Sequence, residues 1–134
     1  MTYDAQRIAI QERFKNQFSA LYPTVPLVFD NLKAEKASDT GYLKLSILNG
    51  DAALKGIGQT RLFRYAGVIS VDIYVPQKTG IKQADLYAQA VDDIFRGQGF
   101  SGIVCRYSGR NDIGIEDNYW RVNISVPFYR DRIS

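Results

Sequence analysis

A strand followed directly by a helix, between Gln59 and Gly97, constrains the fold of this chain most. From Ile69 to Val75 apolar and polar residues alternate, which is the two-residue period of a strand that buries one face. Pro76 has no amide proton to donate to a neighbouring strand, so we expect the strand to end there. Gly67 stands where a side chain would be expected, and it indicates a bulge or a close approach of the backbone.

The helix after Gly80 is predicted from apolar residues that recur at steps of three and four. Arg96 suits the negative end of a helix dipole, and Gly97 is a good left-handed stop. The residues that share the apolar face are Ala84, Tyr87, Ala88, Val91, Ile94 and Phe95. Leu86 lies off this face, and we interpret it as a residue that contacts a partner chain. The natural product of this segment is one helix packed across one sheet.

Similar patterns in the rest of the chain predict the order α-β-β-β-α-β-β. Residues 3 to 22 form the first helix, with Thr2 or Asp4 as its cap and an apolar stripe that includes Tyr3 and Leu21. The other predicted strands are Val25–Phe29, Tyr42–Leu48, Gly102–Ser108 and Tyr119–Phe128. We therefore expect an α+β fold, a single domain over residues 1–134, in which two helices pack on a mainly antiparallel or mixed sheet.

Four polar segments lack the period of a strand and are predicted to lie outside the sheet. Asn49–Gln59 and Gly109–Asn118 contain glycines, and we expect both to be loops. The first of them lacks the GxxxxGK[ST] spacing of a phosphate-binding loop and lacks a following helix. Asp30–Thr40 is compatible with a helix or a turn, and the charged tail Tyr129–Ser134 is predicted to be exposed.

The absence of histidine is the strongest restriction on chemistry. It excludes Ser-His-Asp and Cys-His catalysis and the commonest zinc ligand sets, whereas carboxylate or lysine chemistry stays open. The single cysteine, Cys105, excludes an internal disulfide and is interpreted as a small buried apolar residue. No apolar run approaches the ~20 residues of a membrane span. A net charge of +3 is too small to argue for nucleic acid binding.

The charged side chains leave two interpretations open. A basic surface facing a lumen or an acidic neighbour is one, and a set of unrelated solvated arginines is the other; the residues are Arg61, Arg64, Arg106, Arg110 and Arg121. The carboxylates of Asp112, Glu116 and Asp117 are candidate partners for them across a contact between subunits. They lack the alternating spacing of a calcium loop, so we expect no metal site and no cofactor. Trp120 fits either the core or an interface.

Several short motifs appear in an order that is similar to a known family. A first helix precedes them, and a second, Ala/Asp-rich helix ends in one of them; the motifs are Val25–Asn31, Gly41–Leu43, Arg64–Ile69, Ile94–Phe95 and Val126–Phe128. On these motifs the chain resembles the tail terminator proteins of long-tailed phages, the group around the minor tail protein U of lambda-like phages and its prophage relatives. The resemblance covers nearly the whole chain.

The resemblance implies a structural role without catalytic residues, so we expect no enzyme activity. Such proteins close into a ring, in this case expected to be a hexamer, on the end of a finished tail tube. The ring stops polymerisation of the tube protein and presents a surface to the head-completion or connector protein. DNA passes through the lumen without sequence-specific binding. The expected location is the virion, with assembly in the host cytoplasm and no membrane contact.

The resemblance also implies where subunits meet, at sheet edges, a long loop and helix faces. The corresponding candidates in this sequence are Asn49, Asp51, Lys55, Arg61, Arg64, Arg110, Asp112, Glu116, Asp117 and Arg121. Two other functions stay open. One is a neck or head-completion protein of the same assembly, and the other is a small-ligand-binding or carboxylate-based α+β enzyme, which would show a deep pocket with converging polar groups.

Overall fold

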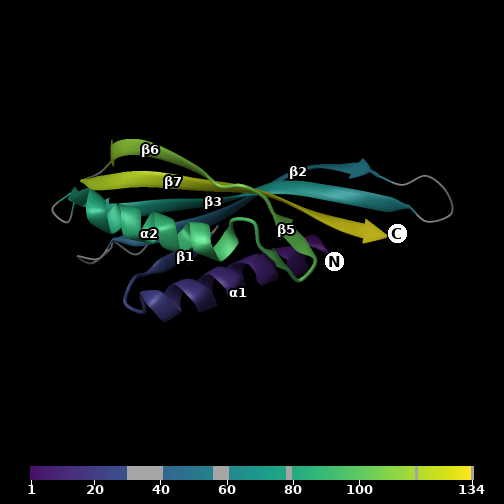
Figure 1. Cartoon of the computed structure of the whole chain (residues 1–134), viewed down its shortest axis with the longest axis horizontal. Coiled ribbons are helices and arrows are strands. Elements are labelled where there is room, and N and C mark those ends of the chain that lie inside the picture. Colours follow the sequence, from purple (N-terminus) through teal and green to yellow (C-terminus); the bar gives the residue numbers. More distant parts are fainter. Residues whose placement is uncertain (30–40, 56–60, 78–79, 117, 134) are drawn as a thin grey trace.

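A computed structural model of the chain describes residues 1–29, 41–55, 61–77, 80–116 and 118–133. Its elements are α1 (Tyr3–Leu21), β1 (Leu27–Phe29), β2 (Tyr42–Leu54), β3 (Leu62–Pro76), α2 (Gly80–Phe95), β4 (Gly99–Phe100), β5 (Ile103–Cys105), β6 (Gly109–Glu116) and β7 (Tyr119–Ile133) (Figure 1). The predicted α+β class and the predicted order of the main elements are confirmed. The structure adds two strands, β4 and β6. The segment 30–40 lies outside the described residues.

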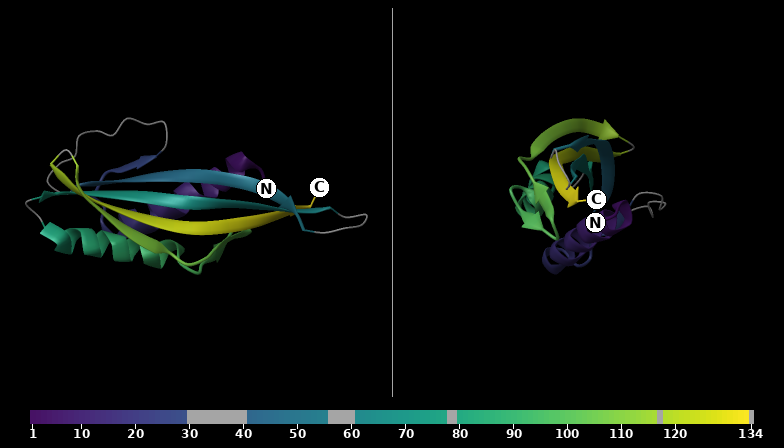
Figure 2. Two further views of the ribbon diagram at one scale, coloured as in Figure 1. Left: turned by 90° about the horizontal axis from the view of Figure 1, so that it is seen from above. Right: turned by 90° about the vertical axis from the view of Figure 1, so that its right-hand side faces the viewer.

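The sheet is mixed and is built on three long strands. Its order is β1-β2-β3-β7-β5-β4, and β6 pairs with β7. Only the contact of β1 with β2 is parallel among the described pairs. On its outer side β7 pairs first with β6 and, further along, with β5. The whole sheet curls, as the view along its long axis shows (Figure 2).

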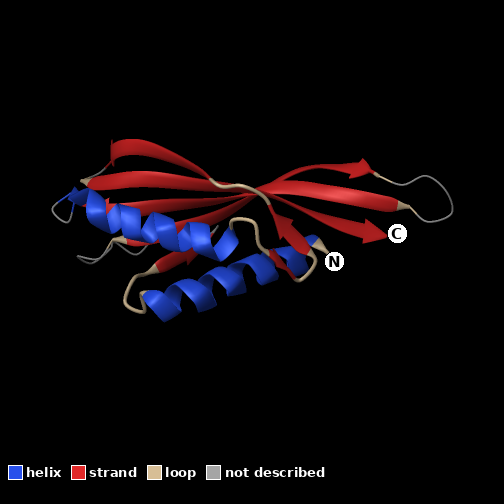
Figure 3. Ribbon diagram, viewed as in Figure 1, coloured by secondary structure: helices blue, strands red, loops and turns tan. Residues whose placement is uncertain are grey.

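Both helices lie on one face of this sheet and bury the core between them and the strands (Figure 3). All six residues of the predicted apolar face of α2 are buried. In α1 the buried residues are Gln6, Ile10, Phe14 and Phe18, whereas Tyr3 and Leu21 are exposed, contrary to the prediction. The two helices meet where the ring of Phe14 stacks on Phe95, with 6.1 Å between their centroids.

The ends of both helices follow the predicted signals. Thr2, rather than Asp4, caps α1, because its side-chain oxygen accepts a hydrogen bond from the N–H of Ala5 at 3.1 Å. Gly97 follows α2 with a φ of 68°, the left-handed conformation that glycine adopts at least cost.

From Gly67 outward the three long strands continue as an arm, which consists of Asn49–Leu54, Leu62–Gly67 and Phe128–Ile133 (Figure 1). At the base of the arm β5 pairs with Phe128–Arg130, and the start of α1 packs against it. Two predictions are wrong here. The segment 49–54 is strand rather than loop, and residues 56–60 lie outside the described residues. The tail from Tyr129 is also strand, and it contains a buried arginine, Arg130. Every residue from Asn49 to Leu54 is exposed, so this segment lacks the apolar alternation from which a strand is predicted.

β6 is the third departure, because Gly109–Glu116 was expected to be a loop. Seven of its eight residues are exposed, so no apolar period marks it as a strand. It forms through backbone pairing with β7, and a register shift between Asp112 and Gly114 accommodates the extra residue. The strand predicted over 102–108 is correspondingly shorter.

The arm leaves the rest of the sheet at Gly67, where the predicted close approach is confirmed. A Cβ at this position would lie 2.7 Å from Cζ of Phe128 and 2.8 Å from the carbonyl oxygen of Leu48. The bulge is on the neighbouring strand, between Asn49 and Ala52. Pro127 lies beside this point, where pairing of β7 passes from β6 to β5, so its missing N–H costs no bond of either pairing.

Candidate interaction surfaces

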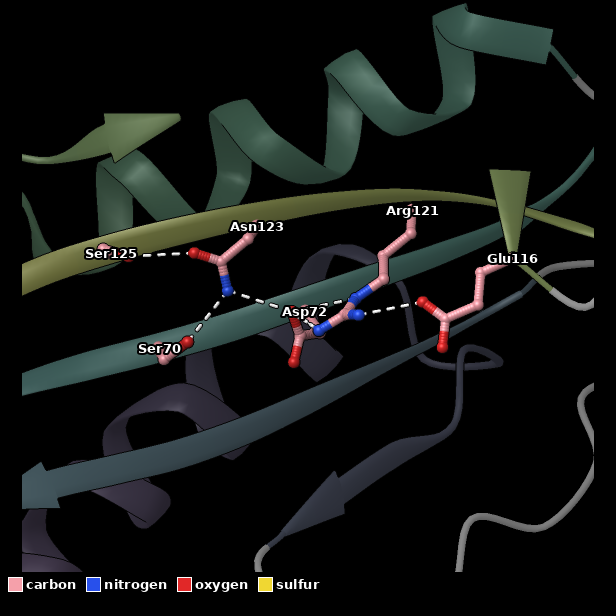
Figure 4. A network of polar contacts seen from close by, with 6 residues as sticks. All are labelled: Ser70, Asp72, Glu116, Arg121, Asn123 and Ser125. Atoms are coloured by element: carbon pink, nitrogen blue, oxygen red, sulfur yellow. Dashed lines mark hydrogen bonds and ion pairs between the residues drawn. The ribbon is translucent and has the colours of Figure 1, made fainter. Parts of the chain in front are cut away.

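A polar network covers the face of the sheet opposite the helices, and Asp72 on β3 is its centre (Figure 4). Oδ1 of Asp72 accepts hydrogen bonds from Nη2 of Arg121 at 3.0 Å and from Nδ2 of Asn123 at 2.9 Å. The same amide donates to Oγ of Ser70 at 2.8 Å, and Ser125 donates to Oδ1 of Asn123 at 2.8 Å. Side chains of two adjacent strands therefore hold one another in place.

Arg121 extends the network to β6. Its Nη1 donates to Oε2 of Glu116 at 2.8 Å, while its Nε and Nη2 face Asp72. Desolvation lowers the pKa of Arg121, but the hydrogen bonds to Glu116 and Asp72 outweigh this effect and raise the pKa overall. The guanidinium stays charged and links β3, β7 and β6, so its ion pairs hold these three strands of the sheet together.

Three tyrosines lie together at the same end of this face. The ring of Tyr42 stacks on Tyr74 with 4.5 Å between centroids, and Tyr119 meets both rings edge-on at 5.7 and 6.2 Å. Tyr42 and Tyr119 come from β2 and β7, which lie on either side of β3, so the contact requires this face to be concave. Burial and then Asp72 raise the pKa of Tyr74 to about 12.

The predicted arginine set is divided between the two ends of the molecule. Arg64 on the arm pairs with Asp131 at 2.8 Å and lies 4.1 Å above the ring of Tyr129. At the other end, Arg110 pairs with Asp85 of α2 at 2.7 Å and with Asp112 at 2.9 Å. The guanidinium of Arg106 also lies over the ring of Tyr129, 4.9 Å from its centroid. Arg61 is exposed.

The carboxylates expected to bridge subunits make contacts inside the chain. Asp112 pairs with Arg110, and Glu116 pairs with Arg121. Asp117 lies outside the described residues. Asn49, Asp51 and Lys55 are exposed on β2 and just after it. A role of any of these residues in subunit contacts stays a prediction.

Sequence reasoning missed Arg130, which is 2% exposed. Its Nε donates to Oε1 of Gln6 at 2.5 Å and its Nη1 to the carbonyl of Met1 at 2.8 Å. The guanidinium lies 4.2 Å from the ring centroid of Tyr65 and 5.1 Å from that of Tyr3. The only sequence feature that indicated burial of Arg130 was its position in the two-residue alternation with Val126 and Phe128. Arg130 ties the start of α1 to the base of the arm.

Exposed apolar side chains are the remaining surface feature. They include Leu48 and Leu54 on β2, Leu86 on α2, and Ile113 and Ile115 on β6. Trp120 packs against the core and is half-buried. Within the described residues no group of three or more His, Cys, Asp or Glu side chains is placed to hold a metal ion. Neither described helix is long and apolar enough to cross a membrane.

Cys105 is buried, as predicted, with 3% of its surface exposed. Burial raises the pKa of its thiol to about 11, against a smaller opposite effect of Arg13. We expect the thiol to be inert to Ellman's reagent in the native chain at pH 8, because the thiolate is the nucleophile. One thiol per chain should react after denaturation in guanidinium. Rapid reaction of the native chain would contradict the burial.

The comparisons with known proteins agree with the fold and with the sequence motifs. A solved protein structure is 22% identical to this chain, with a TM-score of 0.75, and the match covers 98% of this chain and 96% of that chain. Identity at this level shows a shared fold. No curated protein matches the chain. The family model described as phage tail terminator protein matches residues 7–128. This chain therefore belongs to the phage tail terminator family and is a structural protein of phage tails.

Proposed function

We propose that this chain closes into a homo-oligomeric ring, a hexamer, on the end of the finished tail tube. The ring stops further addition of tube protein and then offers its other face to the head-completion or connector protein. It acts by binding and not by chemistry. DNA passes through its lumen without being read in sequence.

The observation that carries this proposal is that the two ends of the molecule differ in shape and charge. The arm and the residues that flank it, Lys55 and Arg61, carry five basic side chains, of which Arg130 is buried, and two carboxylates. At the other end, α2 and β6 carry five carboxylates and two basic side chains, and Arg96 and Arg121 pair with two of these carboxylates. Two unlike and complementary surfaces on one subunit are what a head-to-tail contact requires, and such contacts close into rings when the rotation per subunit allows.

The same proposal places assembly in the host cytoplasm and the finished ring in the virion, between tube and head. Its partners are further copies of this chain, the tail tube protein and the head-completion protein. The two rims of the ring would make the contacts with tube and head.

Tube length tests the capping function. In a phage or prophage from which the gene for this chain is deleted, tail tubes seen by electron microscopy should be longer than normal and variable in length, and heads should be unattached. Supplying the chain in trans should restore one length. Tubes of normal length joined to heads in the deletion strain would contradict the proposal.

A further inference from the structure

We infer that neighbouring copies join by pairing the free edge of β2 in the arm of one copy with the free edge of β6 in the next. This inference rests on the proposed ring and assigns the surfaces from which the ring is built. It makes the sheet continuous from one copy to the next through backbone hydrogen bonds.

The outer edge of β2 is free along the arm. β1 pairs only with Leu43–Leu45, and from Asn49 to Leu54 the described residues offer β2 no partner besides β3. Lys55 donates its N–H to Leu62 of β3, so Ala53 also faces β3. Since successive residues alternate, the N–H and C=O groups of Ala52 and Leu54 point outward.

The outer edge of β6 is free in the same sense, because β6 pairs only with β7 among the described strands. The carbonyl of Pro127 accepts from Arg106, on the side of β7 where β6 also lies. Alternation along β7 then directs Ser125, Asn123 and Arg121 toward β6. The residues of β6 that point their backbone groups outward are Arg110, Asp112 and Ile115.

Neither edge is blocked by proline or lysine, although both contain a bulge and β6 carries Arg110, Asp112 and Glu116. Free edges are normally blunted by proline, by charged side chains (lysine above all), by bulges or by shortness. The stretches Asn49–Leu54 and Gly109–Glu116 contain no proline and no lysine. Both contain a bulge, but each also presents large apolar side chains to solvent: Leu54 is 55% exposed on β2, and Ile115 is 67% exposed on β6. Pairing of the edges would cover these side chains.

Charge selects the second copy as the occupant. The stretch Asn49–Leu54 itself carries one carboxylate, Asp51, but exposed basic side chains lie in or next to the arm, at Lys55, Arg61 and Arg132. The β6 edge lies beside α2 at the acidic end, on the opposite side of the molecule (Figure 1). Pairing β2 with β6 brings the basic arm next to the acidic end, whereas pairing β2 with a second β2 brings two basic arms together. Like charges suppress the wrong pairing, and opposite charges steer the right one.

Chemical cross-linking of single-cysteine additions tests the pairing. We would make Leu54→Cys and Ile115→Cys separately and treat each alone, and then the two mixed, with a short bis-maleimide. The mixture should yield at least about tenfold more covalent dimer than either variant alone, because pairing raises the effective concentration of the two thiols. The wild-type chain is the first control, since its one cysteine is buried. Gln17→Cys, on the exposed surface of α1, is the second.

Light scattering on the same samples separates this inference from the proposed function. Oligomers without the mixed cross-link would overturn the edge assignment and leave the ring intact. Strong cross-linking of Leu54→Cys with itself would show two arms meeting, and would overturn the head-to-tail pairing. A chain that stays monomeric at all concentrations and gives no cross-link would overturn both. The mixed product should also decrease as salt is raised, because the contact joins opposite charges.

Discussion

Replacing Gly41 with alanine should destabilise the chain more than any other exchange of glycine for alanine among the described residues. A Cβ at this position would lie 2.1 Å from the backbone carbonyl oxygen of Tyr74, and φ is +78°. The clash is with backbone and cannot be relieved by a rotamer change. Positive φ adds about 1–2 kcal/mol and overpacking about 1–3 kcal/mol, so we expect the free energy of unfolding to fall by about 2–5 kcal/mol.

Gly80→Ala is the matched control, because Gly80 has nearly the same φ, +76°, with nothing within 4 Å of its added Cβ. It should cost only the conformational strain, about 1–2 kcal/mol. Urea denaturation followed by circular dichroism measures both variants. Equal losses in the two variants would show that the contact with Tyr74 is not as close as the structure has it.

Replacing Arg130 with alanine should cost about 2–4 kcal/mol, since hydrogen bonds of a charged group contribute about 1.5–3 kcal/mol and the buried stem leaves a cavity. The change removes the donors to Gln6 and Met1 and the cation over Tyr65. The first turn of α1 should also exchange its amide hydrogens faster, because it loses its link to the arm.

Arg130→Met keeps most of the buried volume and removes the charge, so it separates packing from hydrogen bonding. We expect it to cost about 1–2 kcal/mol, because Oε1 of Gln6 loses a donor. Arg132→Ala, on an exposed residue of the same strand, should change stability by less than about 0.5 kcal/mol. A loss below about 0.5 kcal/mol for Arg130→Ala would contradict the role assigned to this side chain.

The parts of the fold with a buried face were predictable. The stripe of α2, the strand from Ile69 to Val75 and the strand from Val122 to Val126 are buried as their periods indicate. The sequence failed where pairing is not accompanied by burial. β6 and the end of β2 show no alternation of apolar and polar residues, because almost none of their side chains reach the core. Backbone hydrogen bonds between strands can form with almost any residue type, so they leave no pattern in the sequence.

The candidate surfaces were predictable only as residue types. Arginines and carboxylates marked the right strands, but pairings such as Arg121 with Asp72 and Glu116 depend on which strands are neighbours and in which register. The division of charge between a basic arm and an acidic end follows from the same topology. The burial of Arg130 was not predicted, because a charged residue near a chain terminus is normally exposed to solvent.

Mass by light scattering, over a concentration series at low and moderate salt, tests the central claim most directly. The account predicts a species of six times 15.1 kDa, or a shift from monomer to that mass as concentration rises, with a weaker shift at moderate salt. A stable dimer with no larger species would contradict it, because a dimer uses one surface twice and leaves the unlike ends of the molecule without a role.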